Sequence, residues 1–240
     1  MEERLSISQL NKLGERLRKG QASRDDLRAL DMFRLSFAAA CDQVSHELNK
    51  LGLKPVSRPA KSTASIIAKL NRERSRLSKM QDIAGCRVEV DNSAQQDRVV
   101  TDLVAKFPDA LVYDRRLKPS HGYRAVHLVV DIHGLLVEIQ VRTSLQHGWA
   151  SAVERLADII DLEIKYGGGP EGLRVQLLNL SNTIAGVEEI ENYASDLHER
   201  GHVSPDQTDS LEADVRKLKT DLQEALARTI ILEEETVKKP

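Results

Sequence analysis

The sequence has few aromatic residues and almost no cysteine. Phe, Trp and Tyr make up only 3% of the 240 residues, so a core must be built mainly from Leu, Val, Ile and Ala. The two cysteines, Cys41 and Cys86, lie far apart in apolar surroundings, which favours buried, reduced thiols over a disulfide or a metal site. No apolar run approaches membrane-spanning length, and the first residues contain no signal-like apolar stretch. We therefore expect a cytoplasmic protein without a membrane partner.

The sequence also lacks the commonest motifs of nucleotide and zinc chemistry. It contains no P-loop, no dinucleotide-binding glycine fingerprint, no HExxH pair of metal ligands and no paired CxxC. Each of these motifs places backbone amides, imidazoles or thiolates at a fixed spacing. Any nucleotide or metal chemistry must therefore depend on other residues.

Charge is plentiful but unevenly distributed. Charged residues make up 30% of the chain, and the formal net charge is only -2. Between Lys54 and Arg87, however, nine basic residues face only Glu73 and Asp82, whereas the chain after Gly186 is rich in acids. This asymmetry predicts a basic site for an anionic ligand, with acidic helices elsewhere.

Hydrophobic periodicity divides the chain into three predicted segments. Apolar residues at helical spacing predict N-terminal helices over 1–53, including one helix over 25–51. A core of strands and helices is expected over 54–166, followed by a C-terminal helical extension over 171–240. In its last helix, about 206–235, apolar residues step by three and four like a short coiled-coil seam. Such a seam is typical of a contact with a second copy or a partner protein, and equally of an arm that folds back.

A basic helix is predicted directly after a basic loop, over about 63–79, with Ser62 or Thr63 as its N-cap. Along this helix the basic side chains recur at spacings of three and four and so share one flank: Lys69, Arg72, Arg76 and Lys79. A solvated flank is the common explanation of such a pattern. Here the shortage of acids and the adjacent basic loop favour a flank that faces an anion.

Two acids stand out among apolar strand residues. A hairpin with strands over 123–132 and 135–142 is predicted, joined at the turn His133-Gly134. Alternation puts Glu138 on one face with Gln140 and Arg142, although the strand is too apolar for that face to be solvated. Asp82 stands at the start of another predicted strand. Because magnesium on a nucleotide takes only one or two protein carboxylates, these acids among Lys and Arg indicate magnesium-dependent transfer of a phosphate-containing group. From the residues alone, two structural carboxylates neutralised by arginines remain an alternative.

Four ordered motifs carry a family resemblance. KSTASIIAKL (61–70), DIAGCR (82–87), HGYRAVH (121–127) and EIQVRTSLQHGWA (138–150) resemble, in order and spacing, the RelA/SpoT-type alarmone synthetase domain. The resemblance implies an α+β fold, with a nucleotidyltransferase-like mixed β-sheet flanked by helices and helical extensions at both ends. It also implies a Mg²⁺-dependent pyrophosphokinase that moves pyrophosphate from ATP to the 3′-hydroxyl of GDP or GTP, giving (p)ppGpp. A toxin branch of the family instead modifies the 3′ end of tRNA.

The resemblance assigns roles to individual residues. Asp82 and Glu138 correspond to the catalytic acids that bind the metal, and Gln140 and Arg142 to supporting residues. The residues expected to bind ATP are Lys61, Ser65, Lys69, Arg72 and Arg87. Those expected to bind the acceptor are Arg116, Lys118, His121, Tyr123 and His127. Ordinary packing of Tyr123 in the hairpin and of His127 in the interior are the competing explanations.

Two departures from the family pattern concern the substrates. Small alarmone synthetases often carry Arg where this chain has Pro59, and here Arg58 stands one place earlier. The usual Lys-Pro-Asn before Gly-Tyr is replaced by Lys118-Pro-Ser-His121. The first prediction is therefore an enzyme whose acceptor is GDP or GTP, and the second is an enzyme whose acceptor is the 3′ end of tRNA. The third is an inactive sensor that binds a nucleotide or RNA. No hydrolase activity is expected, because no metal-binding His/Asp set precedes the core.

Overall fold

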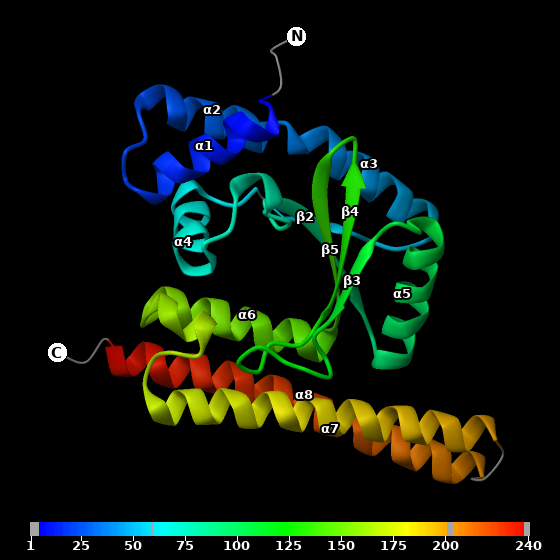
Figure 1. Cartoon of the computed structure of the whole chain (residues 1–240). Helices are drawn as coiled ribbons and strands as arrows, with labels where there is room; N and C mark the ends of the chain where they lie inside the picture. Colours follow the sequence, from blue (N-terminus) through cyan, green and yellow to red (C-terminus); the bar gives the residue numbers. More distant parts are fainter. Residues whose placement is uncertain (1–4, 59, 201–203, 238–240) are drawn as a thin grey trace. The chain divides into compact units, whose positions relative to one another are not determined.

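The computed structural model describes residues 5–58, 60–200 and 204–237 (Figure 1). The chain divides into two compact units. The first unit is drawn from Met1–Val88, Asp102–Val112 and His127–Gln140. The second is drawn from Glu89–Thr101, Tyr113–Val126 and Val141–Pro240. The predicted boundaries of the three segments remain a prediction.

A five-stranded sheet lies mostly in the first unit. Its strands are β1 (Val56–Arg58), β2 (Ala84–Val90), β3 (Leu111–Asp114), β4 (Val126–Ile132) and β5 (Leu135–Thr143). They pair in the order β1-β2-β5-β4-β3, and β1 is antiparallel to β2. The turn between β4 and β5 is at His133 and Gly134, whose φ angles of 53° and 79° suit a two-residue hairpin. The predicted hairpin is confirmed, as is the α+β class with its mixed sheet and terminal helical regions.

Three helices of the first unit, α1 (Ile7–Arg18), α2 (Arg24–Leu35) and α4 (Thr63–Glu73), begin at a capping serine. This unit also contains α3 (Phe37–Lys50) and the short 3-10 helix η1 (Leu77–Lys79). Ser6 and Ser23 form capping boxes on α1 and α2, and α1 packs against α2, α4 and η1. The predicted single helix over 25–51 is wrong. It is broken at Ser36, whose hydroxyl donates to the carbonyl of Phe33 (2.7 Å) and so competes with the helical backbone.

The basic helix is also shorter than predicted. Ser62 caps α4 as expected, but the helix ends at Glu73, and Arg74 adopts a left-handed conformation (φ 48°). Between Leu70 and Leu77 the chain has no apolar residue that could hold a further turn against the core. Arg76 and Lys79 therefore do not continue the flank that Lys69 and Arg72 begin.

The second unit is built mainly from helices. α5 (Ser93–Lys106) begins in it, and α6 (Ser144–Ile159), the 3-10 helix η2 (Leu162–Tyr166), α7 (Glu171–Glu199) and α8 (Pro205–Val237) lie wholly in it. α7 and α8 run side by side and α6 packs against both (Figure 1). Their shared core includes Leu177, Ile184, Val215 and Leu222. Leu218, predicted in the seam, is instead 41% exposed, because α8 turns Val215 and Leu222 toward its neighbours.

The thiols are buried, as the sequence predicts, and the lone tryptophan is buried as well. Cys41 and Cys86 are free and buried. Trp149 is buried and its indole N–H donates to the carbonyl of Leu177 (2.8 Å), so it packs and is held in place. In the described part of the chain, no helix combines the length and the apolar character needed to cross a membrane.

Candidate active site

Glu138 is a buried carboxylate whose two oxygens both have partners. It lies on β5, where both faces of the strand are covered, and only 7% of its surface is exposed. His127 Nδ1 lies 2.9 Å from Oε1, while Arg58 Nη1 (2.9 Å) and Gln140 Nε2 (2.6 Å) donate to Oε2. Burial alone would raise the pKa of Glu138, but the hydrogen bonds and charges of these partners outweigh it and lower the pKa to about 2. Glu138 is therefore ionised at neutral pH.

Asp82, the second predicted acid, also lies in the first unit and is paired with two lysines. Lys61 Nζ donates to Oδ2 at 2.8 Å, and Lys69 Nζ lies 2.9 Å from Oδ1. The second contact lacks hydrogen-bond geometry, so it is an ion pair only. Burial opposes ionisation of Asp82, yet the two ammonium groups lower its pKa below the usual value. Both predicted acids thus carry their negative charge in a partly dry environment.

The backbone explains why these groups come together. The amide of Lys61 donates to the carbonyl of Ile83 (2.7 Å), which fixes Lys61 beside Asp82. Arg58 on β1 lies opposite Gly85 on β2. A Cβ on Gly85 would overlap the carbonyl oxygen of Glu138, so only glycine lets β2 approach β5 so closely there. The glycine of the DIAGCR motif is therefore a packing requirement of the site.

The other residues predicted to bind ATP are spread along neighbouring elements. Ser65 lies in the first turn of α4, where it is hydrogen-bonded to Ser62 (2.9 Å). Arg72 on α4 lies 3.3 Å from Glu73. Arg87 is partly buried on β2, opposite Val56 of β1. The structure thus brings Lys61 and Lys69 to an acid, but pairs Ser65 and Arg72 within α4 and its cap.

The residues predicted to bind the acceptor are divided between the two units. His127 lies in the first unit, where its Nδ1 contacts Glu138 Oε1. In the second unit, Arg116 pairs with Asp114 and Asp97, both at 2.7 Å. Lys118 and His121 are exposed in the loop between β3 and β4.

Arg142 contacts Tyr123 in two ways. Its guanidinium donates to the Tyr123 hydroxyl (2.8 Å) and also lies over the ring, 4.9 Å from the centroid. Arg142 itself is only 4% exposed, so Tyr123 rests on a fixed, buried cation. Tyr123 is half-buried, with its hydroxyl already engaged.

Two residues with buried or partly buried polar contacts, Arg58 and Glu188, were not identified from the sequence pattern. Arg58 appeared there only as a displaced cation, because its pairing with Glu138 spans 80 positions. Glu188 on α7 is buried and accepts hydrogen bonds from Thr143 and Gln146. Burial raises the pKa of Glu188, and these two donors offset part of the rise. Its place one turn after Ile184, on the inward face of α7, was a signal that could have identified it.

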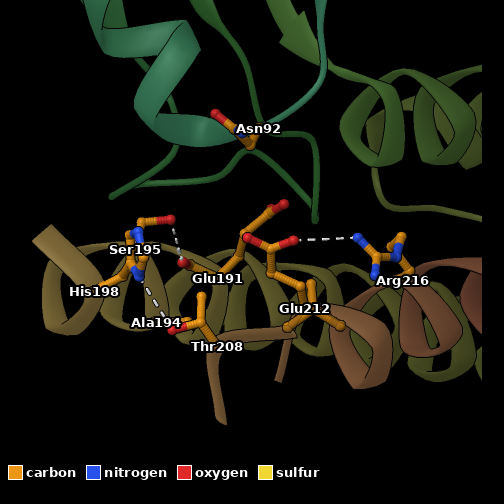
Figure 2. A pocket seen from close by; sticks show the side chains of 9 residues that line it. Asn92, Glu191, Ala194, Ser195, His198, Thr208, Glu212 and Arg216 are labelled. Carbon is orange, nitrogen blue, oxygen red and sulfur yellow. Dashed lines mark hydrogen bonds and ion pairs between the residues drawn. The ribbon is translucent and has the colours of Figure 1, made fainter. Parts of the chain in front are cut away.

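The second unit also contains a polar cavity of about 390 Å³ at one end of α7 and α8 (Figure 2). Its lining residues include Asn92, Glu191, His198, Thr208, Glu212 and Arg216. Glu212 pairs with Arg216 at 3.2 Å, and Glu191 with Lys219 at 2.6 Å, so these acids are neutralised by the protein itself. None of the predicted site residues lines this cavity.

Comparison with known proteins bears on residues of both units. Residues 58–157 match a family model described as the region found in RelA / SpoT proteins. An uncharacterized protein of Mycobacterium bovis and two of Mycobacterium tuberculosis are each 38% identical to this chain over 122 residues. The match covers 49% of this chain and 45% of each relative, so the chain spans just under half the length of these relatives.

Proposed function

Since residues 58–157 form a RelA/SpoT-type domain, we propose that the protein transfers pyrophosphate from ATP to the 3′-hydroxyl of GDP or GTP, giving (p)ppGpp. The observation that carries this proposal is two ionised carboxylates, the partly buried Asp82 and the buried Glu138, each held by basic side chains. Ionised acids among cations suit a reaction in which charge moves along a polyphosphate and little covalent chemistry is left to the protein. A pure binding module would need neither acid.

The acids also fit the magnesium ion that such a reaction uses. Magnesium prefers oxygen ligands and takes only one or two carboxylates when phosphates and water fill its other positions. In the described residues no group of three or more His, Cys, Asp or Glu could hold a metal. We assign the metal to Asp82 and Glu138. When bound, it would neutralise phosphate charge during transfer.

The cations that neutralise these acids are also proposed to bind the donor phosphates. Lys61 and Lys69 neutralise Asp82, and Arg58 neutralises Glu138. With Mg²⁺ held by the two carboxylates, the same cations would pair with the donor phosphates, assisted by Ser65, Arg72 and Arg87. Toward the attacking 3′-hydroxyl, Glu138 would accept a hydrogen bond and so help to activate it.

Label transfer tests this proposal directly. Purified protein with Mg²⁺ and ATP labelled in the terminal phosphate is incubated with GMP, GDP, GTP or tRNA. Labelled guanosine product from GDP or GTP, absent with Glu138→Gln, is expected. Absence of labelled product with every acceptor would overturn the proposal.

A tRNA 3′ end is the second candidate acceptor. Lys118 is exposed in the loop before Tyr123, and cations of that kind bind a nucleic-acid backbone. Label on tRNA with none on guanosine nucleotides would favour this alternative. Because ATP and guanosine nucleotides are cytosolic, we place the activity in the cytoplasm. The exposed Ile190, Tyr193 and Leu218 of the C-terminal helices support a contact there with a second copy or a partner protein.

A further inference from the structure

One guanidinium ties the loop between β3 and β4 to helix α7. Arg124 Nε donates to Ser181 Oγ (3.1 Å) and Nη2 donates to Asn182 Oδ1 (3.0 Å). Nη1 donates to the main-chain carbonyl of Arg116, at the start of the same loop. A planar fork that satisfies three acceptors at once fixes their relative positions far better than a flexible ammonium would.

The same helix holds the loop at a second point. Ser181 Oγ donates to the carbonyl of Gly122, directly before Tyr123. Gly122 has φ +90°, and a Cβ there would lie 2.7 Å from the Trp149 ring. The loop therefore packs tightly onto side chains that belong to α6 and α7. Trp149 is itself bound to α7 through the Leu177 carbonyl.

The residues held in this way are those predicted to meet the acceptor. Between the two anchored carbonyls, of Arg116 and Gly122, lie Lys118 and His121, and Tyr123 follows at once. Without anchors, an exposed loop with a positive-φ glycine would have to be ordered by the substrate, at a cost in binding free energy. The anchors remove that cost in advance.

We infer that α7, through Ser181 and Asn182 acting on Arg124, positions the acceptor loop and so sets the affinity for the acceptor. This inference rests on the proposed function and deepens it. Arg124, Ser181 and Asn182 are positioning residues that act through Lys118, His121 and Tyr123. Ser181 and Asn182 lie beyond the matched residues 58–157, so the C-terminal extension tunes acceptor binding while the donor residues of the first unit stay as they are.

The test separates acceptor binding from donor binding. Arg124→Lys keeps the charge but loses the fork, and Asn182→Ala removes one acceptor from an exposed position. For each variant, kcat and KM are measured for GDP and for ATP, and calorimetry gives Kd for GDP and for a non-hydrolysable ATP analogue. We expect KM and Kd for GDP to rise about tenfold with Arg124→Lys, with ATP values within about twofold of wild type.

Two further variants serve as controls. Thr183→Ala removes an exposed hydroxyl that bonds only within its own helix, to Asn179, and should change nothing. Asn182→Asp keeps an acceptor oxygen for Arg124 and should retain the wild-type KM for GDP. Equal losses for GDP and ATP, or wild-type values in both Arg124→Lys and Asn182→Ala, would overturn the inference. A wild type that pyrophosphorylates no acceptor would overturn the proposed function, and the inference with it.

Discussion

The two units hold their predicted site residues by different means. In the first unit, ion pairs hold the two predicted acids. Asp82 pairs with Lys61 and Lys69, and Glu138 pairs with Arg58. In the second unit, hydrogen bonds hold the acceptor loop to a helix more than 50 residues away. Charge compensation survives small displacements, whereas a hydrogen-bonded loop does not. Substitutions that remove charge should therefore impair the residues predicted to bind the donor. Substitutions that release the loop between β3 and β4 should impair the residues predicted to bind the acceptor.

The largest effect is expected where charge is removed from the first unit. Asp82→Asn or Glu138→Gln should lower kcat about 1000-fold or more, because each change deprives the metal and the phosphates of a fixed counter-charge. Transfer of label from ATP to GDP measures it. The control is Asp109→Asn, which alters an exposed acid and should leave kcat unchanged. Normal turnover by either variant would refute the assignment of that acid.

Next in size is a change of backbone spacing. Gly85→Ala puts a Cβ against the carbonyl oxygen of Glu138 and should lower the free energy of unfolding by about 4 kcal/mol, because two strands must move apart. The matched control is Gly172→Ala on α7, where no atom lies within 4 Å of the added carbon. Urea unfolding compares the two. Similar midpoints for the two variants would show that β2 and β5 are not in such close contact.

The pH dependence of stability probes the compensated charge. The folded pKa of Glu138, about 2, lies below its ordinary value of 4.5. Its contribution is therefore complete above pH 4.5 and is lost as pH falls toward 2, a change of about 3 kcal/mol in the free energy of unfolding. Glu138→Gln lacks this contribution at every pH. The difference in unfolding free energy between wild type and Glu138→Gln should shrink across that window, and a constant difference would contradict the charge pairing.

The smallest effect concerns Arg58. Arg58→Met breaks the 2.9 Å pair with Glu138 and should reduce kcat about tenfold. It should also lower the free energy of unfolding, because the buried Glu138 carboxylate loses part of its compensating charge. Arg58→Lys should recover part of the loss. The exposed Arg28→Met is a matched control. If Arg58→Met turns over like Arg28→Met, Arg58 plays no part in holding Glu138.

Local patterns predicted the donor side better than the acceptor side. The His133-Gly134 turn, the buried polar face of β5 and the cap at Ser62 follow from alternation, turn chemistry and capping over a few residues. The early end of α4 was missed because the basic run continues the charge pattern but supplies no apolar contact. The pairs Arg58–Glu138 and Arg124–Ser181 could not be read from spacing, since 80 and 57 positions separate their members.

Residue roles also depend on partners that the motifs do not show. His127 was assigned to the acceptor, yet its ring is engaged with Glu138. Pro59, a notable departure in the sequence, lies outside the described residues. The displaced Arg58 beside it is described, and its pairing with Glu138 gives that departure a structural consequence.

Asp82 and Glu138 are proposed above all to serve pyrophosphate transfer to a guanosine nucleotide. The most direct test incubates wild type and Glu138→Gln with labelled ATP, Mg²⁺ and GDP, and determines which position of the product carries the label. The expected result is label in the pyrophosphate group attached to the 3′-oxygen of guanosine with the wild type, and no labelled product with Glu138→Gln. Labelled product formed equally by both proteins, or by neither, would contradict the claim.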